Sequence, residues 1–202
     1  MVKVQNKAIF LDRDGVLNLN VLDPIEGERA PRNLQEFKLY EEVETCCKKL
    51  KELGFDLYVV TNQPDLATNL INKTFIEEIE KFLISNLGVK EVLVCPHDKF
   101  EGCMCRKPNP GMLLKLIKNN SLNPSRCFLV GDRFSDVLAA NSVGITAFLI
   151  NGRSAKQGNI LTGNYMGVNS LSEAVEKIHR IETQLISTGI VENYSYRKDK
   201  ND

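Results

Sequence analysis

The chain has 202 residues, a length that suits one domain with a hydrophobic core of its own. Its 26 basic residues balance 26 acidic ones, so no overall field favours nucleic acid or an anionic membrane as a partner. No apolar run approaches the roughly 18 residues of a membrane span, and residues 1–7 lack the apolar stretch of a secretory signal. We therefore expect a soluble protein of the cytoplasm, either a monomer or a weak homodimer.

The first predicted element is a buried strand over residues 7–11, of which 8–11 form an apolar run. The stretch 18–37 has no clean period and contains two prolines and a glycine, which predicts a long loop. Arg29 and Arg32 lie in this loop, where they would either reach an anionic ligand or remain as solvated surface residues.

A predicted helix follows at 40–53, where apolar residues recur at the spacing of an amphipathic helix. The β-branched and aromatic run 55–60 predicts a second buried strand. Residues 74–87 predict another helix, which Thr74 would cap together with Glu77, three residues further on.

The second half of the chain continues the alternation of strands and helices. Its predicted elements are strand 91–94, helix 110–119, strand 127–130, helix 136–143, strand 145–150 and helix 169–181. This alternation predicts an α/β fold with a doubly wound, Rossmann-like parallel sheet flanked by helices. We expect one domain over 1–185 and a polar C-terminal tail over 186–202.

Two carboxylates one residue apart, Asp12 and Asp14, directly follow the first predicted strand and precede Gly15. In extended backbone, residues i and i+2 point the same way, so these acids would share one face. Like charges this close favour a bound cation or a shared proton, which suits a metal-assisted nucleophile beside a general acid/base. The alternative is an ordinary turn, because Asp and Gly both favour turns.

Other polar residues follow later strands in the same way, namely Thr61 and Asn62 after the second and Asp132 after the fourth. The carboxyl ends of parallel strands lie at one edge of the sheet, so these side chains can converge with Asp12. Carboxylates with Mg²⁺, a hydroxyl and the cation of Lys107 together suit phosphoryl transfer. Each residue alone could equally belong to a turn or a solvated loop.

The loop 95–105 contains Cys95, His97, Cys103 and Cys105, four nitrogen and sulfur ligands within eleven positions. A closed set of three cysteines and one histidine is typical of structural zinc, and it would fix the loop just before Lys107. The alternative is a set of unrelated loop cysteines. The remaining thiols are predicted to be small core residues, and they are Cys46, Cys47 and Cys127.

The order of these motifs resembles the haloacid dehalogenase-type phosphatases over about residues 7–180. The matching motifs are Asp12-x-Asp14-Gly15, Thr61-Asn62, Lys107-Pro108 and Gly131-Asp132-x-x-x-Asp136. The resemblance implies that Asp12 is a nucleophile forming an aspartyl-phosphate and that Asp14 is the general acid/base. It also implies that Thr61 and Lys107 hold the phosphoryl group. The implied Mg²⁺ ligands are Asp12, the backbone carbonyl of Asp14 and Asp132, with Asp136 supporting the site.

The zinc cluster followed by the segment 106–112 (Arg-Lys-Pro-Asn-Pro-Gly-Met) resembles one subgroup of this superfamily more closely. That subgroup contains D-glycero-D-manno-heptose bisphosphate phosphatase and histidinol phosphatase, which lack a large cap domain. The loops 19–32 and 95–107 would then shape the substrate pocket. The expected substrate contacts are Arg13, Asn62, Gln63, Arg106 and Arg133.

Two features depart from the heptose enzymes. Residues 64–69 read Pro-Asp-Leu-Ala-Thr-Asn where those enzymes usually have Ser-Gly-Ile-Ala-Arg-Gly, so the arginine is missing at Thr68. The gap between His97 and Cys103 is closer to the histidinol phosphatase form. The leading expectation is a Mg²⁺-dependent phosphatase of a small sugar phosphate, preferably a heptose bisphosphate, with histidinol phosphate second. An inactive zinc-stabilised binding module is the alternative of another class.

Overall fold

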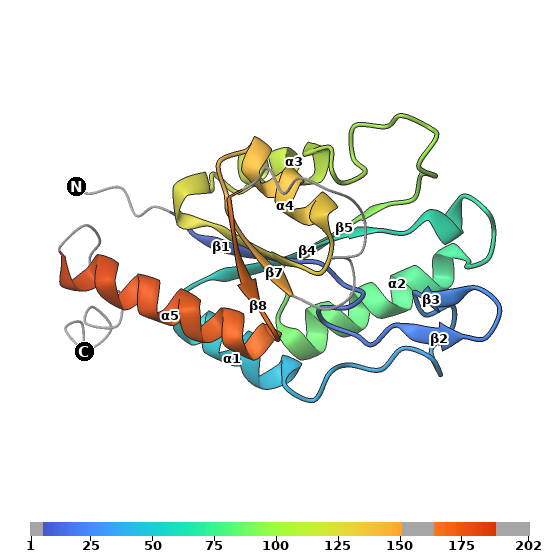
Figure 1. The fold of residues 1–202 in the computed structure, drawn as a ribbon, viewed down its shortest axis with the longest axis horizontal. Coiled ribbons are helices and arrows are strands. Elements are labelled where there is room, and N and C mark those ends of the chain that lie inside the picture. Colours follow the sequence, from blue (N-terminus) through green and yellow to red (C-terminus); the bar gives the residue numbers. More distant parts are fainter. Residues whose placement is uncertain (1–5, 151–163, 189–202) are drawn as a thin grey trace.

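The computed structural model describes residues 6–150 and 164–188, and its centre is a six-stranded sheet with the order β5-β4-β1-β6-β7-β8 (Figure 1). All the pairings in this sheet are parallel, as the alternating pattern predicted. Its strands are β1 Ala8–Leu11, β4 Asp56–Asn62, β5 Glu91–Cys95, β6 Phe128–Gly131, β7 Thr146–Ile150 and β8 Tyr165–Val168. The edge strand β8 was not predicted.

Helices cover both faces of the sheet, as expected for a doubly wound fold (Figure 1). One apolar core lies under α1, α2 and α5, and a second lies under α3 and α4. The helices are α1 Val43–Glu52, α2 Lys73–Phe82, α3 Gly111–Asn119, α4 Phe134–Ser142 and α5 Leu171–Ser187. The predicted core thiols Cys46, Cys47 and Cys127 are all buried.

The prediction of a loop over 18–37 is partly wrong, because this stretch contains an antiparallel hairpin of β2 Val21–Asp23 and β3 Gly27–Arg29. Asp23 shapes the turn, since its Oδ1 accepts hydrogen bonds from the backbone N–H groups of Ile25 and Glu26 at 2.9 and 3.1 Å. Strands of three residues are too short to give a readable alternation of polar and apolar positions. The hairpin packs beside the carboxyl edge of the sheet (Figure 1).

The N-terminus of α2 also differs from the prediction. Asn72 caps this helix, with its side chain accepting from the backbone N–H of Phe75 at 2.8 Å, and Thr74 lies inside the first turn. Asn72 has extended backbone, as a capping residue requires, so the cap lies two residues earlier than predicted. Beyond α2, the π-helical segment η2 Leu83–Leu87 ends at Gly88 in left-handed conformation.

The last helix, α5, is longer than predicted and continues past residue 185. Its buried Glu182 accepts from Lys7 Nζ at 2.6 Å and from Arg126 Nη2 at 2.8 Å. Lys7 precedes β1, and Arg126 lies in the short 3₁₀ helix η3 Pro124–Arg126 before β6, so Glu182 ties α5 to the amino edge of the sheet. Of the predicted tail, residues 189–202 lie outside the described part. No helix among the described residues is long and apolar enough to cross a membrane.

Candidate active site

Asp12 and Asp14 lie at the carboxyl end of β1, between β4 and β6 in the sheet. The β1 ladder continues to Asp12, whose N–H donates to the Val130 carbonyl at 2.9 Å. Gly15 turns the chain at a φ of +81°, and a Cβ on it would lie 2.3 Å from Asp132 Oδ2. Glycine therefore lets this loop approach the end of β6 closely enough for carboxylates from both strands to meet.

Lys107, in the loop before α3, places a buried cation at this point. The residue is 3 % exposed. Its Nζ lies 2.9 Å from Asp12 Oδ1 and 2.5 Å from Asp136 Oδ1 and donates to the Val60 carbonyl at 2.7 Å. Burial lowers the pKa of this lysine, but the two carboxylates outweigh burial and hold the pKa above its usual range. The ammonium therefore stays charged beside Asp12.

Asn62 fixes the loop that carries Lys107. The Asn62 side chain accepts from the Lys107 backbone N–H at 3.1 Å and donates to the Lys107 carbonyl at 3.0 Å. Both hydrogen-bonding groups of this amide are therefore engaged with the backbone, although Asn62 also lines the cavity. Asn62 was expected to contact substrate; the structure places it at the cavity wall, with its amide holding the backbone of Lys107.

The carboxylates of Asp12, Asp132 and Asp136 form a buried cluster whose oxygens lie within 4.8 Å of one another. Burial and then repulsion from neighbouring carboxylates raise the pKa of Asp12 to about 6 and that of Asp132 to about 7, against the pull of Lys107. Asp132 Oδ1 is buried and has no hydrogen-bond partner among the described residues. Crowded carboxylates with an unsatisfied buried oxygen fit a hard divalent cation such as Mg²⁺.

The Asp14 carboxylate does not join this cluster. It accepts hydrogen bonds from Arg13, Asn18 and Gln63 instead. Arg13 was expected to contact substrate, but it is 1 % exposed and does not line the cavity. The sequence could not distinguish these roles, because a polar residue after a strand can point either into a cleft or into the protein.

A cavity of about 770 Å³ opens over Asp12, Thr61, Lys107 and Asp132. Residues of the β2–β3 hairpin, the start of the 3₁₀ helix η1 Pro64–Leu66 and the N-terminus of α4 complete its wall. Of the expected substrate contacts, Asn62, Gln63, Arg106 and Arg133 line this cavity, and Arg13 does not. The structure thus gathers around one opening the polar strand ends and the loop cations that the sequence places far apart.

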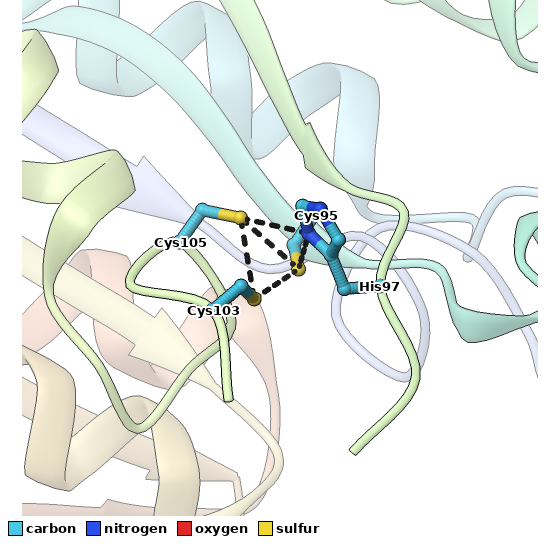
Figure 2. A group of neighbouring side chains, drawn as sticks. All are labelled: Cys95, His97, Cys103 and Cys105. Carbon is cyan, nitrogen blue, oxygen red and sulfur yellow. Dashed lines mark hydrogen bonds between the residues drawn. The ribbon is translucent and has the colours of Figure 1, made fainter. Parts of the chain in front are cut away.

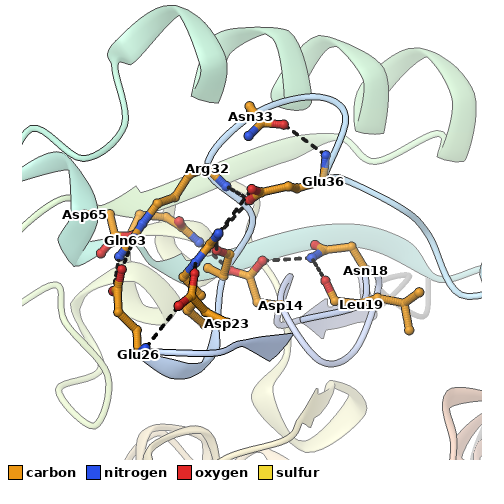
Figure 3. A network of polar contacts seen from close by, with 12 residues as sticks. Asp14, Asn18, Leu19, Asp23, Glu26, Arg32, Asn33, Glu36, Gln63 and Asp65 are labelled. Atoms are coloured by element: carbon orange, nitrogen blue, oxygen red, sulfur yellow. Dashed lines mark hydrogen bonds and ion pairs between the residues drawn. The ribbon is translucent and has the colours of Figure 1, made fainter. Parts of the chain in front are cut away.

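Arg29 and Arg32 are both held by carboxylates at the wall of the cavity. Figure 3 shows Arg32 beside Asp65. Arg32 donates to Asp65 at 2.8 Å and to Glu26 at 2.5 and 2.6 Å, and Arg29 donates to Glu36 at 2.7 Å. These ion pairs join the hairpin to η1 and neutralise both guanidinium groups. The partner carboxylates lie on the hairpin, at Glu36 and in η1, and the sequence alone did not indicate that these segments meet.

The predicted zinc ligands converge on one point (Figure 2). The Sγ atoms of Cys95, Cys103 and Cys105 lie 3.4–3.6 Å apart, and His97 Nδ1 lies 3.2 Å from Cys105 Sγ. A tetrahedral zinc ion would hold such ligand atoms roughly 3.4–3.8 Å apart. The set therefore fits zinc. Arg106 donates to the His97 carbonyl at 3.0 Å, which links the cluster to the cavity.

Comparison with known proteins assigns this chain to a family. The model of the haloacid dehalogenase-like hydrolases matches residues 19–144. The histidine biosynthesis bifunctional protein HisB of Buchnera aphidicola is 35 % identical over 161 residues, 77 % of this chain but only 43 % of that protein. The chain thus spans less than half the length of this relative.

The D-glycero-beta-D-manno-heptose-1,7-bisphosphate 7-phosphatase of Haemophilus influenzae is 31 % identical over 174 residues, 81 % of this chain and 89 % of that protein. Among solved structures, the D,D-heptose 1,7-bisphosphate phosphatase of B. bronchiseptica, complexed with magnesium and phosphate, matches with a TM-score of 0.74 and 26 % identity. That match covers 88 % of this chain and 99 % of the other. The chain belongs to the haloacid dehalogenase-like hydrolase family.

Proposed function

We propose that the protein is a Mg²⁺-dependent phosphomonoesterase that acts through an aspartyl-phosphate on a small sugar phosphate, with a heptose 1,7-bisphosphate as the preferred substrate class. The observation that carries the proposal is the Lys107 ammonium 2.9 Å from Asp12 Oδ1, inside a cluster of buried carboxylates. A binding module without activity would have no need to bury a lysine against several carboxylates, because such burial is costly.

Asp12 is the proposed nucleophile. A carboxylate oxygen of Asp12 attacks phosphorus and forms an acyl phosphate while the bond from phosphorus to the alcohol oxygen breaks. Lys107 offsets the charge that develops on the transferring group, and the Thr61 hydroxyl, at the end of β4, donates to a phosphoryl oxygen. Because the anionic nucleophile and the anionic substrate repel each other, the reaction depends on these cationic and donor groups.

Asp12, Asp132 and the backbone carbonyl of Asp14 are the proposed Mg²⁺ ligands, with Asp136 holding Lys107 and closing the cluster. A bound Mg²⁺ would neutralise carboxylates and phosphoryl oxygens and polarise the phosphorus for attack. The unsatisfied Asp132 Oδ1 supports a metal at this point.

The cysteine cluster is proposed to hold one structural zinc ion. Four protein ligands leave no open position for catalysis, so its effect is to fix the loop that carries Arg106 and Lys107. The three Sγ atoms lie 3.4–3.6 Å apart, which fits metal ligands rather than a disulfide, and metal-binding cysteines support a reducing compartment such as the cytoplasm.

The surroundings of Arg106 support the proposal that the substrate has a second anionic group. Among the described residues, its guanidinium forms no ion pair with a carboxylate, unlike Arg29 and Arg32 on the opposite wall. A phosphate at the far end of a bisphosphate would satisfy this cation. Histidinol phosphate is the second candidate, because the HisB relative shares 35 % identity with this chain.

The test is phosphate release by the purified protein with Mg²⁺ from heptose 1,7-bisphosphate, heptose 7-phosphate and histidinol phosphate. We expect the highest kcat/KM for the bisphosphate, and we expect Arg106→Ala to erase most of its advantage over the monophosphate. A higher kcat/KM for histidinol phosphate would transfer the assignment to that substrate. No release from any of the three would contradict a phosphatase.

A further inference from the structure

The side chain of Asp14 is held by a buried set of donors that take up both of its oxygens. Arg13 contacts Asp14 Oδ1 through Nε at 3.1 Å and both oxygens through Nη2 at 3.0 Å. Gln63 Nε2 donates to Oδ2 at 2.6 Å, and Asn18 Nδ2 donates to Oδ1 at 2.9 Å. We call Arg13, Asn18 and Gln63 the Asp14 cradle.

The members of the cradle are connected to one another and to the phosphate-binding side of the site. Arg13 Nη2 also donates to Gln63 Oε1 at 3.0 Å, which fixes the orientation of the Gln63 amide. That orientation turns Gln63 Nε2 toward Asp14 and toward Thr61 Oγ1, 2.8 Å away. One amide thus connects the side chain at the end of β1 with the hydroxyl at the end of β4.

Arg13 and Asn18 do not line the cavity, and they are 1 % exposed and fully buried, respectively. Gln63 and Asp14 both border the cavity, although Gln63 is only 1 % exposed. Burying an arginine costs several kcal/mol unless its charge and N–H groups are satisfied. The Asp14 carboxylate and the Gln63 carbonyl satisfy this guanidinium, and the Gln63 amide nitrogen donates to Asp14 and Thr61. Because these groups are already engaged with one another, we expect the cradle to act on a substrate through Asp14 and Thr61.

We propose that Arg13 and Gln63 are positioning residues that hold Asp14 in register with Thr61 for proton transfer. This inference rests on the proposed phosphatase function. In the first step, the Asp14 carboxyl gives its proton to the alcohol oxygen as the bond from phosphorus to oxygen breaks and the bond from Asp12 to phosphorus forms. In the second step, the Asp14 carboxylate takes a proton from water as the water oxygen bonds to phosphorus and releases Asp12.

Because of these two steps, loss of the cradle should slow hydrolysis of sugar phosphates more than hydrolysis of nitrophenyl phosphate. An alkoxide leaves only if a proton reaches it, so hydrolysis of a sugar phosphate needs Asp14 correctly aimed. A nitrophenolate is stable as an anion and leaves without that proton. Because kcat/KM reports the steps up to the first irreversible one, a misaimed Asp14 lowers kcat/KM for the sugar phosphate selectively.

The experiment compares kcat/KM for a sugar phosphate and for p-nitrophenyl phosphate in the wild type and in Gln63→Met, which keeps bulk but loses both amide groups. We expect Gln63→Met to lower the value for the sugar phosphate at least about tenfold and that for the nitrophenyl ester by less than about threefold. Arg13→Lys keeps the charge but loses the paired contact, so it should show the same selectivity and serves if Gln63→Met does not fold.

Two further variants calibrate the result. Thr61→Val is expected to lower both values alike, because the phosphoryl group is common to both esters, and Gln184→Met on the exposed face of α5 should change neither. Equal losses on the two esters in both cradle variants, or no loss on either, would overturn the inference while the phosphatase function stands. A wild type inactive on both esters would overturn the proposed function and the inference with it.

Discussion

At the scale of single residues, the central feature of the site is the buried ammonium group of Lys107, which several acceptors share. Lys107 contacts Asp12, Asp136 and the Val60 carbonyl, and Asn62 fixes its backbone from both sides. A phosphoryl group approaching Asp12 would meet this cation first. The contacts that orient Lys107 also neutralise two buried carboxylates, so we expect Lys107 to contribute to both catalysis and stability.

Replacing Lys107 by Met is therefore expected to affect both properties. We expect kcat/KM for the phosphate ester to fall at least about 100-fold, because a donor aimed at developing charge is lost. We also expect the free energy of unfolding to fall by about 3 kcal/mol, because buried carboxylates lose their counter-charge. Steady-state kinetics and urea unfolding measure the two effects. Lys115→Met on exposed α3 is the control, and equal behaviour of the two variants would contradict the assignment.

At the scale of elements, the regular strands and helices were predictable where a long pattern or a polar strand end marked them. The carboxylates after β1 and β6 and the hydroxyl at the end of β4 could be predicted to meet, because the carboxyl ends of parallel strands converge at one edge of the sheet. The hairpin β2–β3 and the edge strand β8 were missed because they are short, and Gly167 interrupts the pattern of β8. The orientations of Arg13 and Gln63 depend on tertiary contacts that no local pattern encodes.

The start of α2 gives a sharp test, since Asn72 and Thr74 are both common capping residues. Asn72→Ala is expected to lower the free energy of unfolding by about 1 kcal/mol, because the Phe75 N–H loses its acceptor. Thr74→Ala should change it by less than half as much, because Thr74 is exposed within the first turn. Urea unfolding compares the variants, and a larger loss in Thr74→Ala would mean that the helix starts elsewhere.

Glu182 provides a second test at this scale, because it joins α5 to Lys7 and Arg126. Glu182→Gln leaves two cations without their shared carboxylate, so we expect a loss of about 3 kcal/mol in the free energy of unfolding. Activity per folded molecule should not change, because this cluster lies at the opposite edge of the sheet from the cavity. Glu176→Gln on the exposed face of α5 is the matched control. A loss of unfolding free energy no larger than that of the control would show that the ion pairs of Glu182 with Lys7 and Arg126 are dispensable.

At the scale of the whole molecule, the proposed active site lies at one edge of the parallel sheet, beside the β2–β3 hairpin and the cysteine-rich loop. The hairpin joins η1 through Arg32, and the cysteine-rich loop extends from the end of β5 on the other side (Figure 1). The described residues contain no separate cap domain over the cavity. Access to Asp12 and the choice of substrate are therefore expected to depend on these two segments.

Removal of the proposed zinc ion tests this view of the cysteine-rich loop. We expect about one zinc per chain by elemental analysis, because the four ligands form a closed set. Cys103→Ser should lose the metal together with most of the activity, since Arg106 and Lys107 follow directly in the loop. Cys46→Ala, in the apolar core under α1, should keep both. Freshly purified protein without zinc would contradict the metal assignment.

The central claim is that Asp12 accepts the phosphoryl group, and mass spectrometry of acid-quenched reactions tests it most directly. During turnover of a phosphate ester with Mg²⁺, we predict a phosphate on the peptide that contains Asp12, with none in Asp12→Asn. A fully active wild type whose phosphate is found on another residue, or an Asp12→Asn variant that retains near-normal turnover, would contradict the account.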